Sequence, residues 1–210
     1  MCDTSSPARR NLPTAPGPRP DPPHGGFRSA QPEGADAPAA SPVPHLTGWP
    51  RDLEWDEFRE IASRPEGESE NAQISVELRP GRLAFIQENG EYRLGDVAFN
   101  TVVKRNQSWV VGSERTDELL AHEQGHYDIG GLCYRDMVAE IRGLRNAQRN
   151  QLVLDVRRVM AAHDQRADLL SQSYDSPEQT DHGRNASRQQ AWEQQISQCR
   201  QSGTPLTTPP

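Results

Sequence analysis

The sequence predicts an α+β fold, with an antiparallel sheet in the first half of its folded part and three helices in the second. Between residues 53 and 111, apolar and polar residues alternate with the period of a strand, and turn sequences such as Asn89-Gly90 separate the segments. After Thr116, apolar residues recur every three or four positions, which is the period of a helix. No helical segment lies between the expected strands, so a parallel βαβ arrangement is not expected.

The expected strands are short. The clearest one is Ala72–Leu78, which alternates strictly and stops at the turn sequence Pro80-Gly81. The remaining expected strands cover residues 53–55, 83–86, 93–103 and 108–111.

Three helices are expected after the strands. Thr116 is suited to cap the first helix, and Asp117 and Glu118 follow it in the first turn, where negative charge is favourable. The second helix is expected from about Asn150 to Leu170, and the third from Ser187 to Arg200.

Composition divides the chain into one domain and two tails. Residues 1–50 hold 12 of the 18 prolines and few apolar side chains, so this stretch cannot offset the entropy lost on ordering. We therefore expect a disordered proline-rich tail over residues 1–46, one domain over residues 47–202, and a second disordered tail over residues 203–210.

The overall composition excludes several classes of protein. Only 33% of the residues are hydrophobic, and no apolar run is long enough to cross a bilayer, so we expect no transmembrane segment. The net charge of −7 argues against a nucleic-acid partner. We expect a monomer. The three cysteines are too few for a disulfide framework, and Cys133 and Cys199, each on the inner stripe of a helix, either pair or remain buried thiols.

One motif on the first helix carries chemistry. Residues 122–126 read HEQGH, in which His122 and His126 lie about 40° apart around a helix, so both imidazoles can reach one metal ion. Glu123 lies beside them, where it can reach a metal-bound water without being a ligand. Both histidines continue the apolar stripe of the helix, and inward-facing histidines need partners, which a zinc ion supplies. Gly125 suggests that another segment or a substrate approaches closely.

A catalytic zinc ion needs a third protein ligand. His163 falls on the apolar seam of the second helix, where a satisfied core histidine is expected, and Asp128 and Glu140 are poorly placed on the helix of the motif itself. His182 lies in a long irregular stretch, 174–183, of the kind that is often functional. The sequence therefore predicts His122, His126 and His182 as the ligands, with Asp175 and then His163 as alternatives to His182.

Three separated motifs resemble a bacterial family of predicted secreted zinc proteases, catalogued as domain of unknown function 922. They are SWVV at 108–111, LLAHEQGHYDIG at 119–130 and YDSPEQTDHGRNASRQQAWEQQIS at 174–197, and the resemblance spans about residues 47–200. The downstream family pattern maps onto Tyr174, Asp175, Thr180, His182, Gly183, Gln190 and Trp192. This chain has an extra residue between Asp175 and Thr180, which affects the placement of Tyr174 and Asp175.

The resemblance implies a zincin-like metallopeptidase domain: a sheet, an active-site helix and two further helices. The expected activity is zinc-dependent hydrolysis of a peptide bond in a protein or peptide substrate, with Glu123 deprotonating the bound water. Tyr174 is a candidate donor to the developing oxyanion or, equally, a packing tyrosine.

Three alternatives to a peptidase remain from the sequence. The first is a non-catalytic zinc-binding module, in which a group such as Asp175 fills the open position. The second is a metal-dependent hydrolase of a cell-wall amide, and the third is a structural protein in which the histidines are incidental. The resemblance also implies an extracytoplasmic or secreted location, although the sequence shows no signal peptide. If a signal has been removed before Cys2, that cysteine is the expected position of a lipid anchor.

Overall fold

The computed structural model describes residues 43–210. The lipid anchor expected at Cys2 and most of the tail expected over residues 1–46 fall outside the described residues. Within them, three small sheets and three helices confirm the α+β class. None of the described helices has the length and apolar character that a membrane span requires.

The strands form three sheets, with the orders β1-β7-β4, β2-β8-β3 and β5-β6. Their bounds are β1 His45–Thr47, β2 Arg59–Ile61, β3 Ala72–Gln73, β4 Val76–Pro80, β5 Phe85–Glu88, β6 Glu91–Leu94, β7 Ala98–Val103 and β8 Trp109–Val111. Because β1 pairs with β7 from its first residue, the ordered domain begins before residue 47.

The sheets differ in one respect from the antiparallel sheet that the sequence predicts. β1 lies parallel to β7, and β2 lies parallel to β8. A period of two indicates which face of a strand is buried, but not the direction of its partner. The other pairs are antiparallel, and Asn89-Gly90 forms the predicted hairpin turn, with φ angles of 53° and 84°.

Two of the predicted strands are altered by contacts that come from distant residues. The segment predicted as one strand, Ala72–Leu78, divides into β3 and β4, and the backbone N–H of Ser75 donates to the hydroxyl of Ser108 between them. Residues 53–55 are not a strand, because the N–H of Leu53 donates to the side chain of Gln124 and a short 3-10 helix, η1, follows at Trp55–Glu57.

The helices are α1 Asp117–Gly143, α2 Arg149–Asp175 and α3 Ala186–Ser202, and a short 3-10 helix, η2, at Gly112–Glu114 precedes α1. Thr116 caps α1 as predicted, since its hydroxyl accepts from the N–H of Leu119 at 3.1 Å. α2 continues five residues beyond the predicted end at Leu170, because Tyr174 in its last turn is completely buried. Asp175 is therefore the last residue of a helix and does not lie in a loop.

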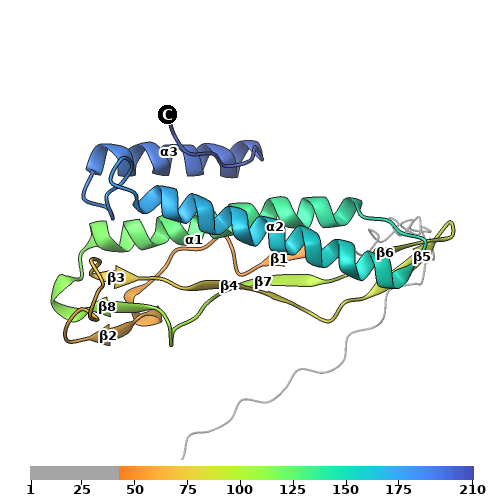
Figure 1. Cartoon of the computed structure of the whole chain (residues 1–210), viewed down its shortest axis with the longest axis horizontal. Coiled ribbons are helices and arrows are strands. Elements are labelled where there is room, and N and C mark those ends of the chain that lie inside the picture. Colours follow the sequence, from red (N-terminus) through yellow and green to blue (C-terminus); the bar gives the residue numbers. More distant parts are fainter. Residues whose placement is uncertain (1–42) are drawn as a thin grey trace, which may run out of the picture. The chain divides into compact units, whose positions relative to one another are not determined.

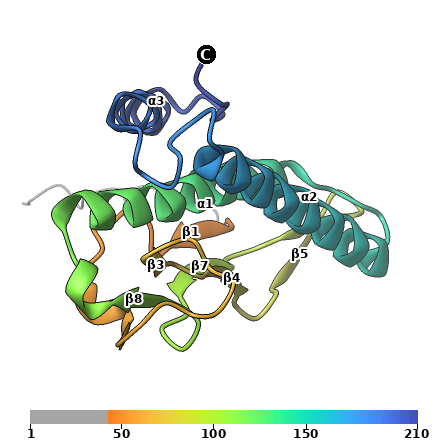
Figure 2. The ribbon, with the colours of Figure 1, turned by 60° about the vertical axis from the view of Figure 1, so that its left-hand side comes forward.

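Helix α1 occupies the centre of the domain. The strands lie on one side of it and α3 lies on the other, while α2 runs beside it (Figures 1 and 2). One apolar cluster joins α1 and α2 to β6 and β7, and another joins α1 to α3 around Trp192. This arrangement buries the stripe of α1 that carries the histidines.

The segment after α3 corrects the prediction of a disordered tail over residues 203–210. Leu206 is only 1% exposed and packs in the cluster of Trp192 and Ile196. Arg166 of α2 donates to the carbonyl of Leu206, and Arg135 of α1 donates to the carbonyl of Thr204. The burial of Leu206, the arginine donors on two helices and the hydrogen bond from Gln195 of α3 to the carbonyl of Thr207 hold the segment in place.

Cys133 and Cys199 are both buried, and both are free thiols in this structure. Burial raises the pKa of the Cys133 thiol to about 11. The sequence left open whether Cys133 and Cys199 form a disulfide or remain buried thiols, and the structure shows buried thiols.

Candidate metal centre

Helix α1 presents three side chains of the HEQGH motif at one buried position. His122 is 3% exposed and Glu123 is 2% exposed. The ring centroids of His122 and His126 are 5.0 Å apart, as the spacing of four residues on one helix face requires. The sequence therefore places these three residues correctly relative to one another.

The last residue of α2 completes this group. Oδ1 of Asp175 lies 3.1 Å from Nε2 of His122 and 2.9 Å from Nε2 of His126. Ligand atoms around a tetrahedral zinc ion lie about 3.3 Å apart, given zinc–ligand bonds of about 2.0–2.1 Å. Burial opposes ionisation of Asp175, but hydrogen bonds from the two histidines outweigh it and lower the pKa of this carboxyl. Asp175 is thus an anion that faces both imidazoles.

Gln189 of α3 fixes the orientation of the His122 ring. Its Oε1 lies 3.2 Å from Nδ1 of His122, and its amide group donates to Glu193 at 3.0 Å. Oε1 of Gln189 can accept a hydrogen bond from a proton held on Nδ1 of His122, and with Nδ1 protonated and a metal ion bound, the lone pair of Nε2 would be the one that binds the metal. The family pattern pointed to Gln190 instead, but Gln190 is exposed and Gln189 is buried.

Tyr174 packs beneath the two histidines. Its ring stacks on His122 at a centroid distance of 4.7 Å and meets His126 edge-on at 4.9 Å. Its hydroxyl donates to Gln189 at 2.8 Å and lies 3.3 Å from the carbonyl of His122. This geometry favours the packing role over the oxyanion donor, since the hydroxyl is already held within α1 and α3.

His182 occupies a second group beside the first. Its Nδ1 lies 2.8 Å from Oε1 of Glu70 and 3.9 Å from Oδ1 of Asp175. The potential ligand atoms fall into two sets that share Asp175, namely His122, His126 and Asp175, and Glu70, Asp175 and His182. The structure thus brings Asp175, rather than the predicted His182, into the set that contains both motif histidines.

Glu123 is enclosed more completely than the other acidic groups of the site. The backbone of Ile74 provides a hydrogen bond to its carboxylate, but its Oε2 has no hydrogen-bond partner among the described residues. Burial raises the pKa of Glu123 to about 8. A buried oxygen of this kind is a position at which a water molecule, an ion or a ligand in the cavity would supply the missing hydrogen bond.

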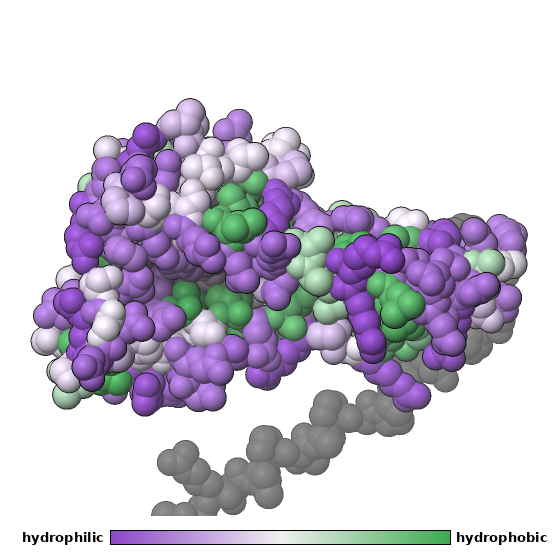
Figure 3. All heavy atoms as spheres, viewed as in Figure 1, coloured by the Kyte–Doolittle hydropathy of each residue, from purple (hydrophilic) through white to green (hydrophobic). Residues whose placement is uncertain are grey.

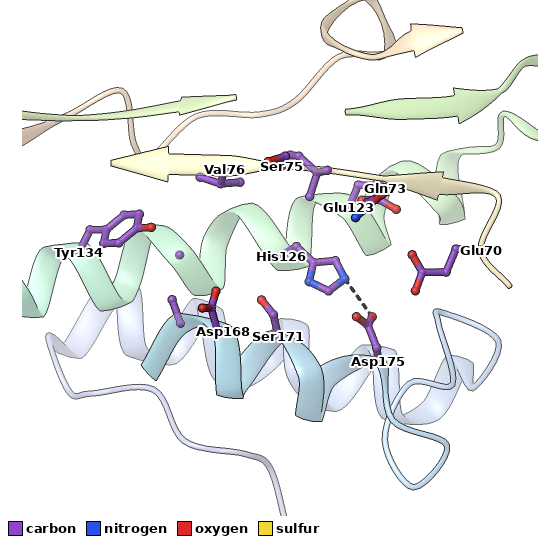
Figure 4. A pocket seen from close by; sticks show the side chains of 13 residues that line it. Glu70, Gln73, Ser75, Val76, Glu123, His126, Tyr134, Asp168, Ser171 and Asp175 are labelled. Atoms are coloured by element: carbon purple, nitrogen blue, oxygen red, sulfur yellow. Dashed lines mark ion pairs between the residues drawn. The ribbon is translucent and has the colours of Figure 1, made fainter. Parts of the chain in front are cut away.

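A cavity of about 300 Å³ adjoins these residues. Residues 73–76 form one wall, α2 forms the other, and His126 lies between them (Figure 4). The space-filling view shows this face hollowed between the helices and the strands β3 and β4, with mostly hydrophilic side chains around the hollow (Figure 3). Two of the candidate ligands, His126 and Asp175, are therefore accessible from this cavity.

Comparison with known proteins supports the resemblance found in the sequence. Residues 104–183 match the model of a family described as "Bacterial protein of unknown function (DUF922)". The matched residues include His122, His126 and Asp175, and the match ends before Gln189. No curated protein and no solved structure matches the chain.

The other candidate ligands have partners outside the two groups of potential ligand atoms. Nε2 of His163 pairs with Glu140 at 2.9 Å, and Asp128 accepts from Trp49 at 2.8 Å. Sequence reasoning did not identify Glu70 and Gln189. One signal could have identified Gln189, because it is a polar residue on the buried stripe of α3 that carries Trp192. No feature of the sequence around Glu70 marks that residue as part of a site.

Proposed function

We propose that the protein is a zinc-dependent peptidase in which His122, His126 and Asp175 hold the metal ion. The observation that carries this proposal is the position of Asp175 Oδ1, which faces Nε2 of both motif histidines at 2.9–3.1 Å. Two imidazole nitrogens and one carboxylate oxygen are a donor set that suits zinc, and three protein ligands leave one position open for chemistry. Asp175 thus replaces His182 as the preferred third ligand.

Glu123 has the position of a general base in this proposal. Glu123 lines the same cavity as His126, and the positive charge of a bound zinc ion would favour its carboxylate form. In that form it would accept a proton from the attacking water and pass it to the leaving nitrogen. When bound, zinc would lower the pKa of that water towards about 7 and polarise the carbonyl group of the substrate.

The strand edges beside the cavity support a peptide substrate. β3 and β4 are each the outermost strand of their sheet, and the residues between and around them line the cavity. An extended peptide is suited to such an edge, because its backbone can add hydrogen bonds to the unpaired side of a strand.

Metal content measured by elemental analysis tests the ligand set. We expect His126→Ala and Asp175→Ala to lose zinc, because each removes one of three ligands. His182→Ala should retain most of it, and His163→Ala, which removes a histidine paired with Glu140 outside the site, serves as the control. If Asp175→Ala kept its full zinc content and His182→Ala lost zinc, the third ligand would be His182 and not Asp175.

Hydrolysis of a casein or peptide-library substrate tests the role of Glu123. Glu123→Gln keeps the shape of the side chain but removes the proton acceptor, so activity should fall by about 10²–10⁴-fold while zinc is retained. A zinc-loaded native chain without hydrolytic activity would contradict the peptidase and favour a non-catalytic zinc-binding module.

A further inference from the structure

The cavity extends beyond the metal ligands along α1 and α2. At this end lie Tyr134 of α1, Asp168 and Ser171 of α2 and Val76 of β4 (Figure 4), and we call them, with Gly130, the Asp168 pocket. A Cβ atom added at Gly130 would meet nothing closer than 3.8 Å, so its missing side chain leaves room in the pocket. Asp168 and Asp175 are seven residues apart on α2, about 10 Å along the helix axis.

The charged side chains that line this cavity are all acidic, apart from His126. Its acidic lining residues are Glu70, Glu123, Asp168 and Asp175, and no lysine or arginine is among the described lining residues. Asp168 has no ion-pair partner in the described part of the chain. The only nearby arginine in sequence, Arg166, is occupied by Asp136 at 3.0 Å and by the carbonyl of Leu206.

Neighbouring groups strengthen the negative potential at Asp168. Partial burial and the charge of Asp164 raise the pKa of the Asp168 carboxyl. Asp164 itself accepts from the hydroxyl of Tyr134 at 3.0 Å, which holds it one turn from Asp168. A cation entering the pocket would therefore meet the carboxylate of Asp168, and the nearby charge of Asp164, which does not itself line the cavity, would add to the attraction.

A second observation indicates that this cavity receives a ligand. Glu123 lines the same cavity, its side chain is 2% exposed, and its Oε2 has no hydrogen-bond partner among the described residues. The Asp168 pocket and Glu123 thus line one continuous cavity of about 300 Å³.

We propose that the Asp168 pocket binds an arginine or lysine side chain of a peptide substrate, at a residue close to the bond that is cut. This inference rests on the proposed function and adds the substrate class. A long cationic side chain that extends from the metal end would place its charge between Asp168 and the hydroxyl of Ser171, and its aliphatic part would lie along Val76 and Tyr134.

Binding to the full, zinc-loaded Glu123→Gln chain tests this inference without requiring turnover. The probes are three dye-labelled alanine-based octapeptides with arginine, norleucine or glutamate at a central position, measured by fluorescence anisotropy. The arginine peptide should bind about tenfold more tightly than the norleucine peptide, the size of one charge-assisted contact. Adding Asp168→Asn should remove that difference, and adding Asp168→Lys should shift the preference to glutamate.

Asp56→Asn, which alters an exposed aspartate on η1 outside the cavity, is the matched control and should keep the preference for arginine. Equal affinity for the arginine and norleucine peptides, or an unchanged preference in the Asp168→Asn chain, would overturn the inference.

Cleavage of the same peptides by the native zinc-loaded chain is measured in a separate experiment. Arginine-selective binding without cleavage would support the Asp168 pocket and contradict the proposed peptidase. Cleavage without a preference for arginine would support the peptidase and contradict the Asp168 pocket.

Discussion

The imidazole of His122 is held at both nitrogens. Nδ1 faces Oε1 of Gln189 at 3.2 Å, and Nε2 faces Oδ1 of Asp175 at 3.1 Å. The amide of Gln189 is itself fixed by Glu193, so the acceptor cannot turn away without losing a second hydrogen bond. The direction of one ring thus depends on residues from α2 and α3.

Replacement of Gln189 tests this dependence. Gln189→Leu removes the acceptor that selects the tautomer, so zinc affinity should fall by about 10–100-fold, the usual effect of losing an outer hydrogen bond to a ligand. Gln189→Glu retains an acceptor and should recover most of the affinity. Competition with a chromophoric chelator measures both, with Gln190→Leu at the exposed neighbouring position as the control. Native affinity in Gln189→Leu would show that the ring is held by other contacts.

Single residues differ in how far the sequence predicts them. His122, Glu123 and His126 were predictable because the helical period alone determines their relative positions. Asp175 and Gln189 were not, because their distances to His122 depend on how the end of α2 and the whole of α3 dock against α1. No local pattern specifies that docking.

At the scale of elements, the close approach of α1 and α2 requires a glycine. A Cβ atom at Gly125 would overlap the phenol of Tyr174, and one at Gly131 would overlap the indole of Trp49. The sequence predicted such an approach at Gly125 but not the partner, because the helical period of α2 fades after Leu170. Burial of Tyr174 extends the helix where propensity alone does not.

Gly125→Ala should therefore destabilise the protein, although alanine normally favours a helix. Displacing Tyr174 from a filled core should lower the free energy of unfolding by about 1–3 kcal/mol. Gly143→Ala, at the end of the same helix, where nothing lies within 4 Å of the added methyl group, should be neutral or stabilising. Urea denaturation of the two variants compares them directly, and equal stability of Gly125→Ala and the native chain would contradict the close contact.

At the scale of the whole described domain, the last segment closes the cluster that supports α3. Leu206 is 1% exposed beside Trp192, and the arginine donors of α1 and α2 hold the backbone on either side of it. The sequence suggested a tail here because prolines and threonines dominate the segment. It carries a single apolar residue, and its burial depends on a site built by three helices.

Leu206→Ala should lower the free energy of unfolding by about 2–5 kcal/mol, the range for removal of a buried leucine side chain. Leu169→Ala on α2 is the matched control, because that leucine is 58% exposed and its loss should change stability little. Thermal unfolding followed by circular dichroism gives both values. A Leu206→Ala chain as stable as the control would mean that the segment is not held in solution.

The position of Asp175 at the end of α2 bears on how such a protein is made. A chain still under synthesis first exposes the two motif histidines, and their oxygen partner follows 49 residues after His126. The glutamine that sets the tautomer emerges later still, on the final helix. A peptidase of this design would stay inert until the end of α2 has docked against α1, because before then the chain offers a metal ion only two of its three ligands. Biosynthesis would thus protect the ribosome-bound chain from its own chemistry.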